Sequence, residues 1–248
     1  MPPEASASTT PAGPVFKDTH WSLVLRAKDL MAPNCEQAMA TLCEQYSYPV
    51  YAFIRRKGHS PHDAEDLGQE FFHRLISKEY LRTVDREKGR FRTFLLTAVQ
   101  RFLCNEWEKS QAQKRGGGAV FVTWDADAAE QRYCEEPAHD LTPEKMFDRQ
   151  WAVRLLEQAK EDLKGEYDSV GKGKFLEVLQ SFIVGEAEHA SYAKAAGILG
   201  LSEGAARVWV HRIRRRYGEL VRKRIANTVN SETAVEEELK TLYAVLSG

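Results

Sequence analysis

The stretch that decides the fold lies near the C-terminal end and reads Ser191-Tyr-Ala-Lys-Ala-Ala-Gly-Ile-Leu-Gly-Leu-Ser-Glu-Gly-Ala-Ala-Arg-Val-Trp-Val-His-Arg-Ile-Arg-Arg-Arg216. Ser191 and Ser202 each precede a helical run, where a serine side chain can accept a hydrogen bond from a free backbone N–H. Gly200 stands between the runs and supplies the left-handed residue that ends the first helix. The stretch therefore predicts a short helix, a tight turn and a longer helix, the pattern of a helix-turn-helix.

Apolar and basic residues fall on different faces of these two helices. The first helix is expected to bury Ala195, Ala196, Ile198 and Leu199. The second is expected to bury Val208, Val210, Ile213 and Tyr217, and to continue through Leu220, Val221 and Ile225. Its opposite face carries Arg207, His211, Arg212, Arg214 and Arg215. Such a helix can enter a DNA major groove, and the alternative is a helical hairpin with a solvated basic face.

Composition and charge exclude few classes of function. The 248 residues suffice for one large domain or two small ones. The formal net charge of −1 conceals Arg-rich stretches balanced by acidic ones at residues 125–140 and 232–238, so nucleic-acid binding is not excluded. The sequence contains neither an apolar run of membrane-spanning length nor a secretory signal pattern. We expect a cytoplasmic protein without membrane insertion.

The residues that could carry metal or catalytic chemistry are weakly arranged. Cys35, Cys43, Cys104 and Cys134 lack CxxC pairing and are interpreted as reduced thiols. His59, His62, Asp63 and Asp66 surround a helix start. However, adjacent residues point apart on a helix, and the acids also complement the helix dipole. No phosphate-binding loop or nucleophile elbow is recognised. We expect no metal, no cofactor and no enzymatic activity.

Further amphipathic helices precede the helix-turn-helix. A helix over residues 34–57 has apolar positions at Ala38, Leu42, Tyr46, Val50 and Phe53. Ser60 and Pro61 start a second helix, with one face formed by Ala64, Leu67, Phe71 and Leu75. Thr142 and Pro143 start another, with Phe147, Trp151, Leu155, Ala159 and Leu163 at four-residue intervals. Two more are expected, around Phe175–Phe182 and from Ser231 to the C-terminus.

The helix expected over residues 88–115 combines cations with aromatic rings. Its inward face is predicted to hold Phe91, Leu95, Ala98, Phe102 and Leu103, and its polar positions are Arg92, Arg101, Lys109, Lys114 and Arg115. Phe94 and Trp107 are expected to lie partly outside the core. Cations that follow phosphates and aromatic faces that stack on bases are typical of single-strand binding, each stacked base contributing roughly 1–3 kcal/mol. The alternative is an ordinary amphipathic helix with core aromatics.

The predicted fold is all-α, with two small helical domains joined by a linker. Residues 1–18 are expected to be disordered, 19–115 to form the first domain with a short helix near Trp21, and 116–140 to be an irregular linker. Residues 141–228 form the helix-turn-helix domain, and 229–248 a tail helix. A flexible linker does not hold a fixed distance between two domains.

Three segments in this order resemble the bacterial RNA polymerase sigma factors, specifically the extracytoplasmic-function (ECF) subfamily of the sigma-70 family. They are the helix at Asp63–Leu75, the segment Gly89-Arg-Phe-Arg-Thr-Phe-Leu95, and the C-terminal helix-turn-helix. The resemblance covers roughly residues 21–224. It implies a sigma region two-like bundle and a sigma region four-like domain. The implied partners are core RNA polymerase, through its beta-prime clamp helices and beta flap, and promoter DNA.

The resemblance also implies roles for individual residues in transcription initiation. It implies that polymerase is bound by Asp66, Gln69, Glu70 and Arg74. It implies that the opened minus-ten strand is bound by Arg92, Arg101, Asn105, Trp107, Lys109, Lys114 and Arg115. It implies that the minus-thirty-five element is recognised by Tyr192, Lys194, Ser202, Arg207, His211, Arg212, Arg214 and Arg215. The segment Arg101–Trp107 is shifted relative to the common minus-ten pattern, and the tail extends past the minimal two-domain form.

Three alternatives remain open. A helix-turn-helix repressor or activator would bind a palindromic duplex as a dimer without polymerase. A helical hydrolase would use the cluster of His59, His62 and Asp66. The tail helix, acidic through Glu236, Glu237 and Glu238, either folds back on a domain, binds a regulator such as an anti-sigma protein, or is simply solvated.

Overall fold

The structure is a computed structural model, and it describes residues 35–77, 90–112, 125–135, 141–183, 191–229 and 231–247. Within these ranges the chain is all-α and contains no strand, which confirms the predicted fold class. The elements are α2 (Cys35–Arg56), α3 (Pro61–Ile76), α4 (Phe91–Ala112), α5 (Ala126–Glu135), α6 (Pro143–Ser169), α7 (Gly173–Leu179), the 3-10 turn η3 (Gln180–Phe182), α8 (Tyr192–Leu199), α9 (Glu203–Ala226) and α10 (Glu232–Ser247). The predicted helix near Trp21 and disordered residues 1–18 lie outside the described residues.

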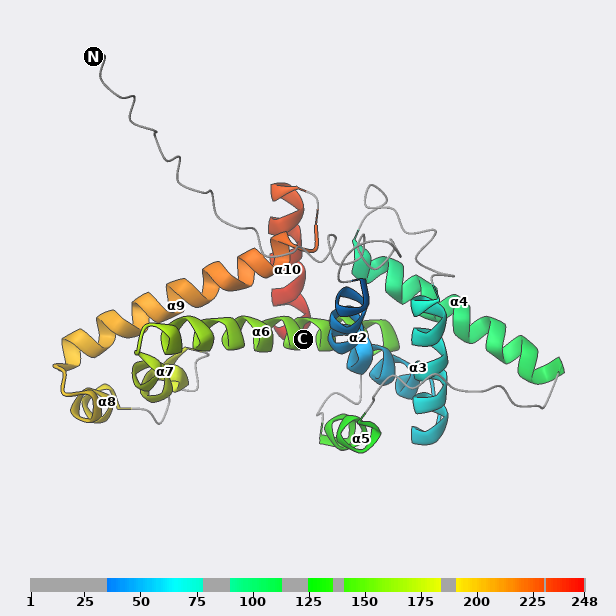
Figure 1. Ribbon diagram of the computed structural model, residues 1–248, viewed down its shortest axis with the longest axis horizontal. Helices are drawn as coiled ribbons and strands as arrows, with labels where there is room; N and C mark the ends of the chain where they lie inside the picture. Colours follow the sequence, from blue (N-terminus) through cyan, green and yellow to red (C-terminus); the bar gives the residue numbers. More distant parts are fainter. Residues whose placement is uncertain are drawn as a thin grey trace, which may run out of the picture.

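The long helix α6 runs across the molecule and packs on elements from both ends of the chain (Figure 1). One part of it contacts α2, while α7, α9 and α10 also pack on it. Its 27 residues begin at a capped terminus, where the Thr142 hydroxyl accepts a hydrogen bond from the backbone N–H of Lys145 at 3.3 Å. The predicted stripe is confirmed, because Phe147, Trp151, Leu155, Ala159 and Leu163 are all buried.

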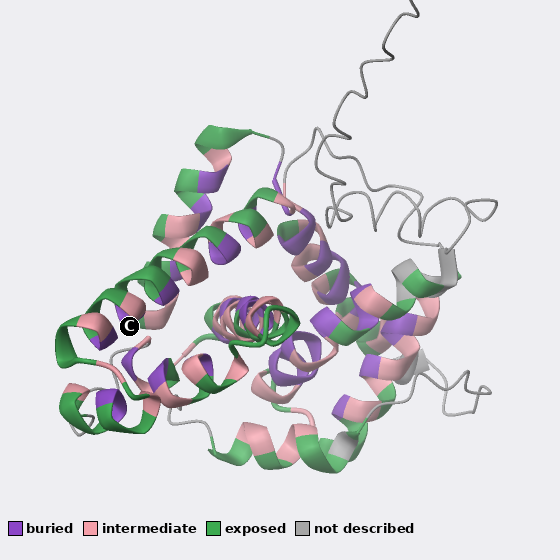
Figure 2. Ribbon diagram, turned by 60° about the vertical axis from the view of Figure 1, so that its left-hand side comes forward, coloured by how far each residue is buried: buried purple, intermediate pink, exposed green. Residues whose placement is uncertain are grey.

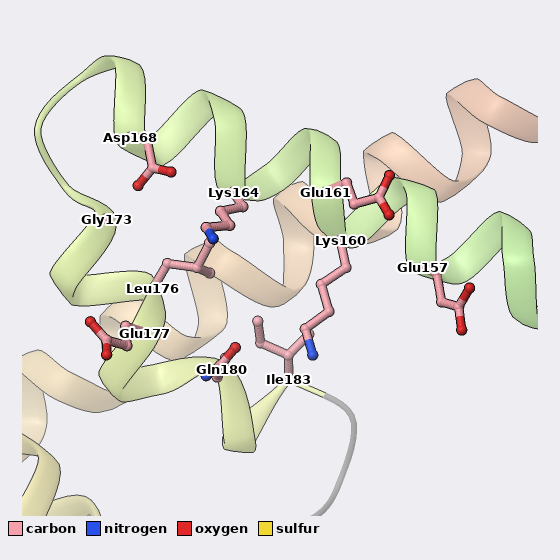
Figure 3. Close-up of a pocket in the computed structure, with 10 residues that line it drawn as sticks. All are labelled: Glu157, Lys160, Glu161, Lys164, Asp168, Gly173, Leu176, Glu177, Gln180 and Ile183. Atoms are coloured by element: carbon pink, nitrogen blue, oxygen red, sulfur yellow. The ribbon is translucent and has the colours of Figure 1, made fainter. Parts of the chain in front are cut away.

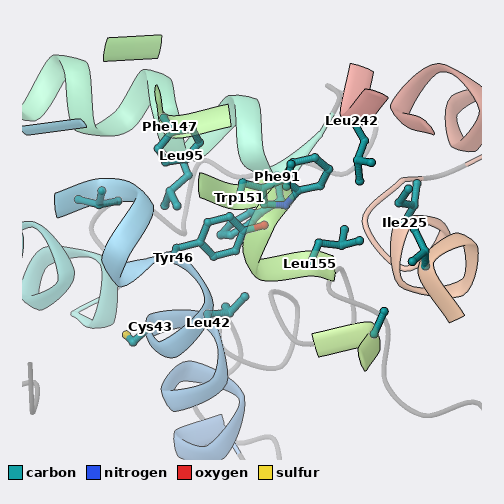
Figure 4. Packing of buried hydrophobic residues seen from close by; sticks show 14 of the residues in the cluster. Leu42, Cys43, Tyr46, Phe91, Leu95, Phe147, Trp151, Leu155, Ile225 and Leu242 are labelled. Carbon is teal, nitrogen blue, oxygen red and sulfur yellow. The ribbon is translucent and has the colours of Figure 1, made fainter. Parts of the chain in front are cut away.

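Aromatic side chains fill the core where α2, α4 and α6 meet. Tyr46, Phe91 and Trp151 come from these three helices and gather at one place, with Leu242 and Ile225 beyond them (Figure 4). The rings of Tyr46 and Phe91 meet edge to face with centroids 5.4 Å apart, a geometry that aromatic pairs favour. The faces that the helices turn toward one another are buried and their outward faces are mostly exposed (Figure 2).

Helix α5 lies in the segment that we expected to be an irregular linker, so that expectation is wrong for residues 126–135. Glu130 on α5 accepts hydrogen bonds from the Tyr51 hydroxyl at 2.5 Å and from Arg55 Nε at 2.8 Å, both on α2. The bonds from Arg55 hold the pKa of Glu130 below its ordinary value. Helix α5 is therefore attached to α2. The division of the chain into two domains stays a prediction.

The tail helix α10 packs on α6 and α9. Ser231 caps it by accepting a hydrogen bond from the backbone N–H of Ala234 at 3.2 Å, and its predicted apolar stripe places Val235 and Leu242 in the core. Arg222 on α9 pairs with Glu232 at 2.5 Å, across the turn between the two helices. Of the alternatives left open for the tail, the structure shows the one in which it folds back.

Replacing Leu155 by alanine should destabilise the whole structure. Leu155 lies in the middle of α6, on which both α2 and the C-terminal helices α9 and α10 pack. A buried Leu→Ala change costs about 2–5 kcal/mol of unfolding free energy. Calorimetry should show one unfolding transition that moves as a unit to lower temperature. Val170→Ala, which changes a side chain 63% exposed at the end of α6, should alter stability by less than about 0.5 kcal/mol. Two separate transitions, with only one of them shifted, would contradict this.

Candidate nucleic-acid interface

Helices α8 and α9 are set at an angle by the predicted capping residues. Ser191 caps α8, and the Ser202 hydroxyl accepts a hydrogen bond from the backbone N–H of Ala205 at 3.2 Å to cap α9. Gly200 ends α8 in the left-handed conformation, with φ of 66°, where an L side chain would be strained. The predicted caps and the glycine turn are therefore confirmed.

The outward face of α9 is basic, as predicted. Arg207, His211, Arg212, Arg214 and Arg215 are all exposed. Val208 is 50% exposed on this same face, so the prediction that it is buried is wrong. The buried positions are Ala206, Val210 and Ile213, whose spacing of four and three residues defines a face that excludes position 208. On α8, Ile198 is likewise exposed rather than buried.

The arginines of this face differ in the groups that they contact within the protein. Arg207 pairs with Glu203 at 2.7 Å and lies over the ring of Tyr192, 4.3 Å from its centroid. Arg214 donates from Nε to the backbone carbonyl of Phe182 at 2.8 Å, which ties α9 to the turn after α7. Arg207 is therefore oriented by a neighbouring ring at the outer surface, whereas Arg214 connects two elements of the fold.

An ion pair that the sequence pattern does not predict fixes α9 against α6. Arg216 donates to both carboxylate oxygens of Glu166, at 2.7 and 2.8 Å, and these bonds hold the pKa of Glu166 below its ordinary value. Arg216 directly follows Arg214 and Arg215, which are predicted to bind DNA, although Arg216 itself is not among the predicted residues. Only the position of α6 shows which of these arginines is used inside the protein.

Helix α3 presents the residues expected to bind polymerase. Asp66 is exposed and lies 3.2 Å from His62 Nδ1, Gln69 donates to Glu65 at 3.1 Å, and Glu70 pairs with Arg74 at 2.7 Å. Arg74 also pairs with Glu106 of α4 at 2.8 Å and lies over the ring of Phe102. Asp66, Gln69 and Glu70 thus share an accessible surface, while Arg74 is turned toward α4.

Helix α4 presents three of the residues expected to bind an opened strand. Arg101, Asn105 and Trp107 are exposed, and the Trp107 side chain is 66% exposed as predicted. A pocket of about 420 Å³ brings Trp107 together with Asp66, residues that we assigned to different roles. Lys114 and Arg115 lie outside the described residues, as does the side chain of Lys109.

Arg92 departs from its expected position. We predicted it on the polar face of α4, but it is only 6% exposed. It pairs with Asp148 of α6 and with Glu238 of α10, and its guanidinium lies 4.5 Å from the ring centroid of Trp151. The position at the first turn of α4 faces α6, which the pattern of α4 alone does not show. A role of Arg92 in DNA binding stays a prediction.

A second pocket, of about 590 Å³, lies between α6 and α7 (Figure 3). Leu176 and Ile183 give it an apolar part, and Lys160 and Lys164 reach into it from α6 beside carboxylates of both helices. None of the residues predicted to bind DNA or polymerase lines it. In the part of the chain that the structure describes, no group of three or more His, Cys, Asp or Glu side chains could hold a metal ion. No described helix is long and apolar enough to cross a bilayer.

Comparison with known protein families assigns one part of the chain. Residues 42–113 match the model of sigma-70 region 2, a segment that includes most of α2, all of α3 and α4. The match covers less than a third of the chain and supports membership in the sigma-70 family. Searches of curated proteins and of solved structures found no match.

Adjacent arginines on α9 should separate a structural role from a surface role. Arg214→Ala removes the donor to the carbonyl of Phe182 and should cost about 1.5–3 kcal/mol of unfolding free energy, as expected for a hydrogen bond to a charged group. Arg215→Ala removes only a surface pair with Glu219 and should change stability by less than about 0.5 kcal/mol. Urea unfolding of the two variants measures the difference, and equal stabilities would show that the bond to Phe182 contributes nothing.

Proposed function

We propose that the protein is a promoter-specificity subunit of the ECF type, which binds core RNA polymerase and directs it to promoters with defined minus-thirty-five and minus-ten elements. The match of residues 42–113 to sigma-70 region 2 carries this proposal, because that region belongs to factors that bind core polymerase and act in promoter recognition. We propose a cytoplasmic location and no enzymatic activity of its own.

Polymerase docking is assigned to α3. The exposed Asp66 and the half-buried Gln69 and Glu70 lie on a surface that the core of the protein does not use. Carboxylates on such a surface complement basic groups of a partner and steer association. The clamp helices of the beta-prime subunit are the proposed partner.

Opening and binding of the minus-ten strand are assigned to α4. Arg101 and Asn105 supply polar contacts to the sugar-phosphate backbone of the DNA strand. Trp107 supplies an exposed ring on which a base can stack. Three exposed groups on one helix next to the α3 surface support this assignment. Lys109 belongs to the same helix, and Lys114 and Arg115 follow it in sequence.

Recognition of the minus-thirty-five element is assigned to α8 and α9. The exposed face of α9 carries Arg207, His211, Arg212 and Arg215, while Tyr192, Lys194 and Ser202 lie at the starts of the two helices near where phosphates would pass. Arginine reads guanine in the major groove through two hydrogen bonds. Arg214 is a weaker candidate for base contact, because it is held by Phe182.

The proposal predicts that specific promoter binding requires core polymerase. A mobility-shift assay with labelled promoter fragments should give a specific complex only when the protein and core enzyme are both present, and transcription from those fragments should follow. Core enzyme alone is the control. Tight binding of a palindromic duplex by the free protein would instead support a helix-turn-helix regulator that acts without polymerase.

Arg207→Ala should weaken the use of promoters that depend on the upstream element, by about 1–3 kcal/mol if Arg207 contacts a base. Binding to core polymerase should be unchanged, because α3 is not affected. Transcription is compared on promoters with an intact and a scrambled upstream element. Lys240→Ala, which removes an exposed cation on α10, serves as the control. An equal loss on both promoter types would contradict the assignment of Arg207.

A further inference from the structure

An ion cluster joins the start of α4 to the tail helix α10. We call Arg90, Arg92, Glu237 and Glu238 the α4–α10 cluster. Glu238 lies between the two arginines, with Arg90 Nε at 3.0 Å from one carboxylate oxygen and Arg92 Nη2 at 2.9 Å from the other. Glu237 adds a contact to Arg90 at 3.1 Å. Two carboxylates of the tail therefore pair with the two cations at the start of α4, and Asp148 of α6 pairs with Arg92 as well.

The centre of the cluster, formed by Glu238 and Arg92, is buried, although Arg92 is not fully hydrogen-bonded. Glu238 is 1% exposed and Arg92 is 6% exposed. The Nε atom of Arg92 is buried without a hydrogen-bond partner. Removing charges from water is costly unless every donor and acceptor is paired, so such a network is weak evidence for a purely stabilising role. Buried charged groups of this kind are better known for setting register or for acting in switches.

The tail covers only one end of the strand-binding helix. Arg101, Asn105 and Trp107 lie further along α4 and are exposed, whereas the cations at its start face α10. The other acidic residues of α10 point elsewhere, since Glu232 and Glu236 pair with Arg222 of α9. The contact of α10 with α4 is therefore separate from its contact with α9.

We propose that Glu237 and Glu238 occupy the place of nucleic-acid phosphates at the start of α4, so that the tail helix competes with DNA for Arg90. A carboxylate between two guanidinium groups makes the same charge-assisted hydrogen bonds as a phosphate. When α10 is displaced, Arg90 extends the strand-binding surface toward the first turn of α4, whereas Arg92 keeps its pair with Asp148 of α6. This inference rests on the proposed role of α4 in binding single-stranded DNA.

The test is the salt dependence of single-strand binding by the full-length protein. A labelled oligothymidylate of 20 nucleotides serves as the probe, and its dissociation constant is measured over a series of salt concentrations. Each phosphate contact on single-stranded DNA contributes about −0.7 to the slope of log K against log salt. The double variant Glu237→Gln, Glu238→Gln should bind more tightly than the wild type, with a slope steeper by about 0.7 for one added contact, that of Arg90.

Glu236→Gln is the matched control. It removes a neighbouring carboxylate of α10 that pairs with Arg222 rather than with α4. Its slope should equal that of the wild type. Adding Arg90→Ala to the double variant should remove this gain of about 0.7 in the slope. An unchanged slope in the folded double variant, or the same change with Glu236→Gln, would overturn the proposal.

Thermal melting establishes whether each variant is folded. If replacing the buried Glu238 prevents folding, Glu237→Gln takes its place, because that side chain is 61% exposed. It should steepen the slope in the same direction by less than the double variant, and an unchanged slope would again overturn the proposal. The single-strand binding assay contains no polymerase. If transcription with polymerase failed, the proposed function would be contradicted, but the comparison of salt dependence between variants could still be read. Absence of single-strand binding by both the wild type and the double variant would contradict the inference.

Discussion

Burial of the apolar stripe on α6 is the interaction on which the rest of the structure depends. A helix of 27 residues spans about 40 Å, which is long enough to pack on α2 near one end and on α9 near the other. Without α2, or without α9, part of this apolar stripe would be exposed to water. Because α2 and α9 both pack on α6, the surface formed by α3 and α4 is held in a fixed position relative to the surface of α9, which a flexible linker cannot provide.

Charges inside the protein then decide which parts of each surface are accessible. Arg216 is bound by Glu166, Arg55 by Glu130, and Arg92 by Asp148 and Glu238. Each of these pairs joins two helices, so several cations that could meet DNA phosphates are used to hold elements together. The exposed cations of α4 and α9 are therefore fewer than the basic stretches of the sequence contain. The proposed nucleic-acid interface is smaller and more sharply defined as a result.

Much of the fold could be predicted because its signals are local. A serine or threonine before a helix, such as Thr142 or Ser202, caps the residues that directly follow it. A stripe repeated every three or four residues marks the buried face of a long helix, as along α6. Helix α5 was missed because it is short and polar, and its attachment depends on Arg55 and Tyr51, which are about 75 residues away in the sequence. Val208 is apolar yet exposed, so apolar character alone does not predict burial.

By itself the sequence determined the helical class, the order and capping of most helices, and the basic face of α9, since these follow from hydrogen bonds and side-chain spacing within a few residues. Only the tertiary structure decided which charged side chains face water. Arg92 and Arg101 lie on the same helix, yet α6 and α10 cover the first and leave the second exposed. The energy of a buried charge depends on partners brought from distant segments, and no local pattern contains that information.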